Sequence, residues 1–492
     1  MNHTLPAWHS NLRANTLSGI TSAFALVPEC LSFALLAHVH PLMGLYGAFF
    51  ICTITALFGG RPGMISGAAG SMAVIIVALV LEHGVQYLLA CTLLSGLIML
   101  LYGVLRLGKL VRMVPHPVML GFVNGLALLI AGAQLSHFKT SSEPGAAWLS
   151  GSAMAWVLGL TLLTILITWL LPRFTRSVPS ALVAIISVGL LSYALSLPVH
   201  TLGDQATIAG TLPQFALPQV PLEWRTLQII FPYALLMAIV GLLETLLTQS
   251  LCDEQTGTVG QANRECIALG AANMVSSSFG GMGGCAMIGQ TVINLRSGGT
   301  TRLSGIVSGC MVLMFILFLS PLIERIPLAA LAGVMLVVAQ QTFSWKSLLG
   351  LRKIPRADAL VIVTVTLVTV LTDLAFAVLC GIMITALHFA WQHAKSLDGE
   401  RASTATGNTL YTIRGTLFFA SSTRFLDFFT PPQDSALSIL NCQYLHIMDH
   451  SALASIQTLQ ERYRKQGKQL QLIQVCERNQ RLLQRAGIPF TC

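Results

Sequence analysis

The sequence contains few charged residues. Only 10% of its 492 residues are Asp, Glu, Lys or Arg, whereas 54% are hydrophobic and the mean hydropathy is +0.73. Soluble globular domains carry about 25% charged residues, so this composition excludes an ordinary water-soluble fold. Apolar runs of about 18 or more residues recur from Leu17 to about Trp391, and each can cross a hydrocarbon core of roughly 30 Å as a helix. We therefore predict an all-α polytopic membrane protein over 1–395.

The sequence also lacks the patterns of several other protein classes. Its 11 cysteines stand mostly singly in apolar segments, without Cys/His spacing, so we expect no metal site, no disulfide and no cofactor. The net charge of +9 is explained by basic residues at the ends of membrane spans, and we expect no nucleic-acid partner. The first apolar run is too long for a cleavable signal and contains Pro28 and Glu29, so we expect it to remain as a membrane helix.

The apolar runs divide into fourteen predicted spans. They lie near 17–36, 41–60, 65–82, 86–106, 117–137, 154–171, 180–197, 229–249, 265–280, 285–296, 302–319, 327–342, 356–371 and 373–393. A seven-plus-seven division gives two repeats, over about 17–197 and 229–393.

Lysine and arginine predict the orientation of the spans, because cytoplasmic loops collect them. With the N-terminus inside, fourteen basic residues fall on the cytoplasmic side and three on the outside. The inside set is Arg13, Arg61, Arg106, Lys109, Arg112, Arg173, Arg176, Arg264, Arg296, Arg302, Lys346, Arg352, Lys353 and Arg356. The outside set is Lys139, Arg225 and Arg325. This asymmetry predicts an even number of spans with both termini cytoplasmic, as in a multi-pass protein of the bacterial inner membrane.

Two spans begin with glycine-rich segments at corresponding positions. Residues 66–72 (SGAAGSM) open the third span, and residues 280–287 (GGMGGCAM) open the tenth, which is the third of the second repeat. Matching interrupted spans indicate an inverted repeat whose half-helices meet near the membrane midplane. Non-helical backbone persists there only inside protein or along a cavity, and two facing helix starts attract an anion. The alternative is that these glycines only permit close helix packing.

Two glutamates lie inside spans, again at matching positions. Glu29 is in the first span and Glu244 in the eighth, and a carboxylate near the bilayer centre costs about 2.5 to 3.5 kcal/mol on insertion scales. We therefore expect both to face a cavity, although a protonated glutamate bonded to another helix is the alternative. Thr248 follows Glu244 by four residues and shares its helix face. Asp373 falls at a span boundary and is expected to be solvated.

Energetics suggests a role for these glutamates. Moving an anion into a cell against the membrane potential costs about 2.3 kcal/mol per charge per 100 mV, so accumulation needs a coupled cation or exchange for another anion. A carboxyl group removed from water holds a proton more readily, so Glu29 or Glu244 can carry a proton with the anion. Coordination of sodium by Glu244, Thr248 and backbone carbonyls is the competing use. The sequence leaves both coupling ions open.

Several stretches resemble the sulfate permease (SulP) family of anion transporters. They are residues 281–299 (GMGGCAMIGQTVINLRSGG), 301–305 (TRLSG), 27–29 (VPE), 44–46 (GLY) and 241–248 (GLLETLLT). The resemblance covers almost the whole chain and is greatest to bacterial members with a glutamate after the first-helix proline, which are thought to couple dicarboxylate uptake to protons. It implies a fourteen-helix core-and-gate fold, shared with nucleobase transporters, in which the core moves as an elevator. It also implies a homodimer.

The resemblance places the substrate between the third and tenth spans. On this chain the implied substrate-binding residues are Ala69, Gly70, Ser71, Cys285, Ala286, Met287 and Ile288. The implied cation-coupling residues beside them are Glu29, Glu244 and Thr248.

Two positions depart from some family members. Gly283 stands where they have proline, and Gln290 stands where they have arginine. Loss of a fixed positive charge favours a cation-coupled symporter over an exchanger or channel, unless Gln290 faces away from the site.

The polar C-terminal region predicts a small cytoplasmic α/β domain over 408–492. Apolar runs at 437–440 and 469–473 are typical of strands, and 451–466 has the pattern of an amphipathic helix. Residues 445–453 (LHIMDHSAL) resemble the strand-to-helix turn of the STAS domain (sulfate transporter and anti-sigma-factor antagonist). Ser451 occupies the position that is phosphorylated in anti-sigma antagonists, while Asp449 or Ser451 can instead cap the helix. This domain can therefore bind a cytoplasmic partner.

Three functions remain after these observations. The first is proton- or sodium-coupled symport of a small anion such as a dicarboxylate, bicarbonate or sulfate. The second is nucleobase transport on the same fold, and the third is a membrane sensor that signals through its STAS domain. We predict no enzyme activity, because the C-terminal region has no paired nucleophile and base and no phosphate-cradling loop.

Overall fold

The computed structural model describes residues 11–108, 115–140, 147–174, 180–205, 212–221, 223–372, 374–404 and 407–491. Lys109, Arg112, Arg176 and Asp373 of the sequence predictions lie outside these residues. The chain forms two compact units, residues 1–381 and 382–492.

Among its described residues, the regular structure of the first unit is helical apart from two short strands. Its first half contains α1 (Leu12–Leu36), α2 (Pro41–Phe58), α3 (Gly70–His83), α4 (Val85–Val104), α5 (His116–Ala133), the 3-10 helix η2 (Gln134–Phe138), α6 (Gly151–Phe174) and α7 (Ser180–Ala194). The second half contains α8 (Leu202–Gln205), α9 (Trp224–Thr256), α10 (Ala262–Ser278), α11 (Ile288–Arg296), α12 (Arg302–Phe318), α13 (Ser320–Glu324), α14 (Leu328–Thr342), α15 (Trp345–Gly350), α16 (Arg356–Leu371) and the start of α17 (Leu374–Lys395).

A helix lies at each predicted span, and the short helices α8, α13 and α15 were not anticipated. Among the described residues, seven helical segments are long and apolar enough to cross a membrane. These are α1, α2, α4, α5 with η2, α6, α9 and α14 with α15, while α3, α7 and α12 are shorter apolar helices. The helical membrane architecture is thus confirmed, and the number of fourteen spans stays a prediction.

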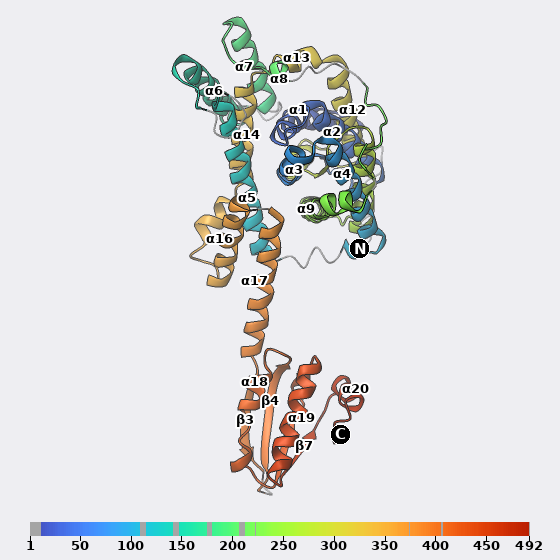
Figure 1. Ribbon diagram of the computed structural model, residues 1–492, viewed down its shortest axis with the longest axis vertical. Helices are drawn as coiled ribbons and strands as arrows, with labels where there is room; N and C mark the ends of the chain where they lie inside the picture. The colour runs from blue at the N-terminus through green and yellow to red at the C-terminus, as the bar shows by residue number, and fades with distance from the viewer. Residues whose placement is uncertain are drawn as a thin grey trace. The chain divides into compact units, whose positions relative to one another are not determined.

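The helices of the first unit pack in two groups (Figure 1). One group, here called the core group, contains α1–α4 and α9–α12; the other, the gate group, contains α5–α7, α14 and α16. Each group draws helices from both halves of the chain, so that α4 packs on α10 and α5 on α16. Contacts between the groups are few and involve mainly α1 with α7 and α14, and α3 with α5.

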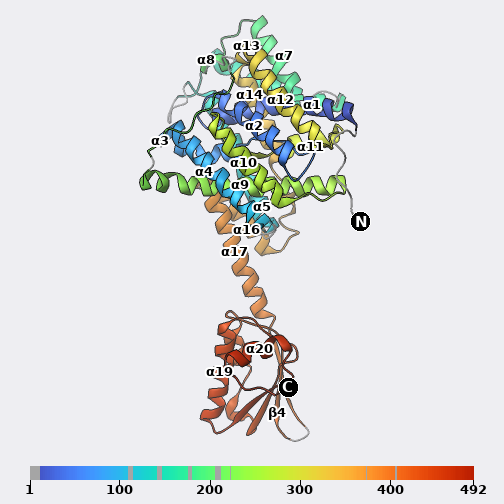
Figure 2. The same cartoon turned by 90° about the vertical axis from the view of Figure 1, so that its right-hand side faces the viewer.

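Small residues allow a close crossing of α4 and α10 in the core group. A Cβ atom added to Gly96 of α4 would lie 2.7 Å from the Gly270 carbonyl oxygen, and one added to Gly270 would lie 2.5 Å from the Gly96 oxygen. Backbones that approach this closely pack well without any hydrophobic driving force from water. Figure 2 shows α9 as a long helix passing α10 and α4, and it contacts both.

The second unit is an α/β domain with its own hydrophobic core. Its strands are β3 (Asp398–Ser403), β4 (Thr409–Leu417), β5 (Leu437–Asn441), β6 (Leu445–Ile447) and β7 (Gln469–Ile473), in the order β3-β4-β5-β7 with β6 paired to β4. Only β3 and β4 are antiparallel among these pairs. Its helices are α18 (Ser422–Asp427), η3 (Pro431–Gln433), α19 (His450–Lys465) and α20 (Glu477–Arg485). The sheet begins with the polar strand β3, before the boundary at Asn408 that the sequence suggested.

The helix α19 packs one apolar face on this sheet. Ala452, Ile456, Leu459 and Tyr463 follow each other at three- and four-residue intervals and are fully buried. Its N-cap is Asp449, whose Oδ1 accepts a hydrogen bond from the Ala452 backbone N–H at 2.9 Å.

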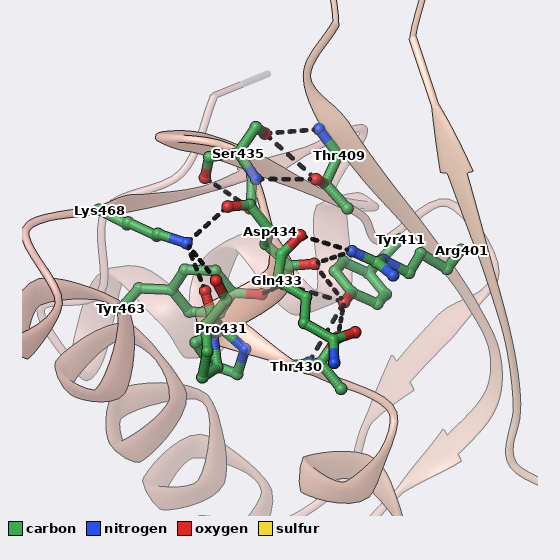
Figure 3. A network of polar contacts seen from close by, with 12 residues as sticks. Arg401, Thr409, Tyr411, Thr430, Pro431, Gln433, Asp434, Ser435, Tyr463 and Lys468 are labelled. Carbon is green, nitrogen blue, oxygen red and sulfur yellow. Dashed lines mark hydrogen bonds and ion pairs between the residues drawn. The ribbon is translucent and has the colours of Figure 1, made fainter.

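A buried carboxylate, Asp434, ties the segment after α18 to the rest of this unit (Figure 3). Its oxygens accept hydrogen bonds from the Tyr411 hydroxyl at 2.9 and 3.0 Å and from the Tyr463 hydroxyl at 2.5 Å. Arg401 forms an ion pair with it at 2.7 Å, and the Lys468 ammonium donates to its backbone oxygen at 2.5 Å. A network of this kind stabilises the fold only while every member keeps its partner.

We expect Asp434→Asn to destabilise the second unit by about 3 kcal/mol, because two buried hydroxyl groups and a guanidinium lose a charged acceptor. Chemical unfolding of residues 382–492, followed by circular dichroism, measures the effect. Asp427 is exposed, so Asp427→Asn is the matched control and should change stability little. Equal stability of both variants would contradict the role given to Asp434.

The stability of this unit should also fall in alkaline solution. Burial, together with the hydrogen bond to Asp434, raises the pKa of Tyr463 above its ordinary value. The unfolded tyrosine has a pKa of about 10, so this contribution is complete below pH 10 and is lost as the pH rises above it. We expect Tyr463→Phe to flatten the stability profile above pH 10, whereas Tyr444→Phe, at an exposed tyrosine, should leave the profile unchanged.

Candidate substrate site

Two short strands from the two halves of the chain pair at the centre of the core group. β1 (Ser66–Ala68) is antiparallel to β2 (Gly284–Ala286), with Gly67 opposite Cys285. Each strand leads directly into a half-helix: β1 into α3 and β2 into α11. Since the strands are antiparallel, the chain leaves the ribbon towards the two half-helices at opposite ends, and these ends are about 7 Å apart along a three-residue strand.

Both half-helices begin without a side-chain cap. The N-cap residues are Ala69 for α3 and Met287 for α11, and both have extended backbone and no side-chain capping bond. The N–H groups of a first helical turn have no partner within the helix and carry partial positive charge. Two such turns near one another form a site that favours an anion.

Side chains of neighbouring helices hold the ribbon in place. The Asn273 amide of α10 accepts a hydrogen bond from the Gly284 N–H at 2.9 Å and donates to the Gly284 oxygen at 3.0 Å. The Thr291 hydroxyl of α11 accepts from the Ile65 N–H at 3.1 Å. Gly284 has no space for a side chain, because an added Cβ would lie 1.9 Å from the Gly67 oxygen.

Glu244 of α9 contacts both the ribbon and the first half-helix. Its Oε2 accepts hydrogen bonds from the Ser71 hydroxyl at 2.5 Å and from the Cys285 thiol at 3.1 Å. Ser71 is the second residue of α3, and Cys285 is the middle residue of β2. The carboxyl group of Glu244 therefore accepts hydrogen bonds from two donors, Ser71 and Cys285, that belong to the substrate site predicted from the sequence.

Glu29 of α1 has the corresponding position at the second half-helix. It lies beside Gln290, the third residue of α11. Gln290 is 1% exposed, and its amide nitrogen forms no hydrogen bond of ordinary geometry. The sequence left open whether Gln290 faces away from the site; the structure turns it towards Glu29.

The two glutamates are thus arranged crosswise. Glu29, from the first half of the chain, adjoins the half-helix of the second half, and Glu244, from the second half, adjoins the half-helix of the first. The residue after each glutamate bonds the strand of its own half. The Cys30 thiol donates to the Ala68 oxygen at 3.7 Å, and the Thr245 hydroxyl accepts from the Ala286 N–H at 3.0 Å.

The structure brings all the residues of the predicted substrate and coupling sites to this region. Of the substrate set, Ala69, Gly70, Ser71, Cys285, Ala286 and Met287 are buried, and Ile288 is 38% exposed. Glu29 and Glu244 are half-buried. Thr248 is fully buried, and its hydroxyl donates to the Glu244 backbone oxygen at 2.8 Å. Ser451 lies in the second unit, exposed in the first turn of α19.

The residues that support the site were not predicted from the sequence. Asn273, Thr245 and Thr291 are polar residues inside apolar spans, and that was the available signal. Spacing alone cannot show that Asn273 reaches a strand eleven residues later, because the intervening turn decides it. No group of three or more His, Cys, Asp or Glu side chains suited to a metal ion occurs among the residues with described structure.

Comparison with known sequences gives two matches along the chain. The sequence model of the sulfate permease family matches residues 12–366, and that of the STAS domain matches residues 401–491. A Bacillus subtilis protein named "Putative sulfate transporter YbaR" is 42% identical over 466 residues, covering 94% of this chain and 95% of its own. The bicarbonate transporter BicA of Picosynechococcus is 30% identical over 417 residues, covering 80% and 73%.

Solved structures show the same fold. The transmembrane domain of a cyanobacterial bicarbonate transporter BicA has a TM-score of 0.66 at 29% identity, covering 75% of this chain and 98% of its own. The murine Solute Carrier 26 family member A9 anion transporter has a TM-score of 0.84 at 17% identity, covering 98% and 88%.

We expect Gly284→Ala to disrupt the ribbon, because its Cβ overlaps a backbone oxygen that cannot move aside. The melting temperature of the purified protein should fall, in line with a loss of about 3 kcal/mol for overpacking. Gly159→Ala in α6 is the matched control, since nothing lies within 4 Å of its added Cβ, and it should keep or raise the melting temperature. Equal melting temperatures for the two variants would contradict the predicted close approach of the strands.

Proposed function

The chain belongs to the sulfate permease family, and on that premise we propose that it is a secondary active symporter in which a proton accompanies a small anion. It is an anion transporter of this family with a C-terminal STAS domain, and a transporter rather than an enzyme. Sulfate and bicarbonate are candidate substrates, since similar proteins are named as transporters of these anions. Dicarboxylates are a third candidate, from the resemblance of residues 27–29 to dicarboxylate-type members.

The proposed binding site is the space between the starts of α3 and α11. The half-helix starts supply backbone N–H groups, and Ser71 adds a hydroxyl donor beside them. The described residues at these two helix starts include no arginine or lysine, so the attraction comes from backbone dipoles and hydroxyl groups. A site of this kind accepts several small anions and does not by itself select a tetrahedral group over a planar one.

The observation that carries the coupling proposal is the position of Glu244. Its carboxyl oxygen already accepts hydrogen bonds from Ser71 and Cys285 at the first half-helix. Two unit charges about 5 Å apart repel by ~3 kcal/mol at an effective dielectric constant of 20, so an ionised Glu244 and an anion disfavour each other roughly a hundredfold. A proton on the carboxyl group removes this repulsion and frees donors for the anion.

Glu29 has the same proposed role at the second half-helix. Its carboxyl group lies beside Gln290, where some family members carry an arginine. Without that fixed cation, the charge of a bound anion is offset only if a mobile cation enters with it. Glu29 and Glu244 are the two acidic groups that adjoin the half-helix starts in the described structure, so one or both carry that cation.

Sodium is the competing coupling ion. Glu244 and Thr248 lie one turn apart on the same face of α9, and oxygen ligands of this kind bind hard cations. The experiment below separates the two ions by their gradients.

The proposed transport movement is an elevator displacement of the core group against the gate group. Its support is the division of the helices, with the whole binding region inside the core group and few contacts to the gate group. We further propose that the protein works as a homodimer in the bacterial inner membrane with both termini in the cytoplasm. The exposed Ser451 is then available to a cytoplasmic kinase or partner.

The test is uptake of radiolabelled fumarate, sulfate, bicarbonate and uracil into proteoliposomes under an inward proton gradient, an inward sodium gradient or neither. We expect proton-driven uptake of an anion in the wild type and at least a tenfold loss of proton-driven uptake in Glu29→Gln and Glu244→Gln. Glu82 has a side chain that is 67% exposed, so Glu82→Gln is the matched control.

Three outcomes of this test contradict the proposal in different ways. Sodium-driven uptake moves the coupling to the alternative ion. Uptake of uracil alone contradicts anion transport, and absence of uptake under every gradient favours a sensor function.

A further inference from the structure

A cavity lies between the core and gate groups, away from the half-helix ribbon. It has a volume of about 780 Å³. One wall is the end of α1 and its connection to α2, including Ser32 and Leu36. The opposite wall is the end of α5 with η2 and the residues after it, including Leu135, Lys139 and Trp148.

The described lining of this cavity carries a single permanent charge, and that charge is positive. Lys139 is its one permanently charged side chain among the described residues, and His38, His40 and His137 also line it. No carboxylate occurs among these lining residues. Asp204 lines a smaller adjoining cavity that Lys139 also lines, and its carboxylate accepts hydrogen bonds from the Thr201 backbone and hydroxyl group at 2.7 and 3.0 Å.

Lys139 is held in position by its surroundings. Its backbone forms an isolated β-bridge with Trp148, and its ammonium group lies 5.6 Å from the centre of the Trp148 ring. The side chain is half-buried, so its charge is less screened than that of a fully solvated lysine.

The cavity adjoins the helix face that carries Glu29. Ser32 lines the cavity and follows Glu29 by three residues, and Leu36 follows it by seven, so the three share one face of α1. One helical turn rises about 5.4 Å, so the cavity starts within about one turn of the proposed coupling site. The distribution of lysine and arginine in the sequence predicts that this end of α1 faces the outside of the cell.

We propose that this cavity is an outer vestibule that captures small anions through Lys139 and delivers them along α1 to the half-helix site. The inference rests on the proposed function, because it identifies the entrance to the same site. A positive group in a partly enclosed cavity raises the local concentration of anions and therefore their rate of entry. Capture by charge needs no selective contact, and the described residues at the half-helix starts include no arginine that could provide one.

The first test measures the vestibule without transport. Leu135 lines the cavity and is 49% exposed, so Leu135→Cys places a reactive thiol there. A negatively charged methanethiosulfonate should modify this thiol about threefold faster than a positively charged one of the same size at low salt, relative to their rates with a free thiol. Modification of the parent protein supplies the background from native cysteines.

Adding Lys139→Gln to this variant should abolish the preference, and Lys139→Arg should retain it. Arg325→Gln removes another basic residue predicted on the same side that does not line the cavity, and it should leave the preference unchanged. A Leu135→Cys protein that reacts equally with both reagents, or a preference that survives Lys139→Gln, would overturn the proposal.

The second test is the kinetics of anion uptake. Lys139→Gln should raise the apparent KM about threefold at low ionic strength with an unchanged kcat, and the difference should vanish in concentrated potassium gluconate. A change in kcat with unchanged KM would overturn the capture role. If the wild type transports no anion, the proposed function fails, while the reagent preference still reports on the vestibule.

Discussion

The pairing of three backbone residues from each half of the chain is the constraint on which the rest of the core group depends. A broken helix inside a membrane leaves N–H and C=O groups that hydrocarbon cannot satisfy. The backbone groups of β1 and β2 form hydrogen bonds with each other, and the Asn273 side chain bonds the N–H and C=O groups of Gly284. Only because these backbone groups are paired can two helices begin in the interior, with their uncapped first turns facing the same region.

The position of the glutamates follows from that ribbon. Helices α1 and α9 flank it from opposite halves of the chain, and each carries its glutamate to the half-helix of the other half. The next residue in each case bonds the strand of its own half, at Ala68 and at Ala286. A change in the charge of either glutamate therefore changes the electrostatic potential at a helix start and at the ribbon. The proposed symport uses this arrangement to link cation binding to anion binding, because the glutamates and the anion share donors at the half-helix starts.

Much of the fold could be predicted because it depends on local signals. Hydrophobic length located the membrane helices, and matched glycine-rich segments located the interrupted ones. The pairing of β1 with β2 was less accessible, since it joins residues more than two hundred positions apart and no periodicity encodes it. Strand β3 was missed because it is an edge strand with largely exposed, polar residues and lacks the alternation that burial of one face produces. The Asp434 network was equally hidden, since Arg401, Tyr411, Tyr463 and Lys468 meet only through the sheet topology.

The most direct test of the crosswise coupling is the number of protons taken up when an anion binds to the purified protein, measured with a pH indicator in weakly buffered solution. We expect uptake of about one proton per bound anion near neutral pH, and a clear reduction when Glu244 is replaced by glutamine. Anion binding without proton uptake in the wild type would contradict it.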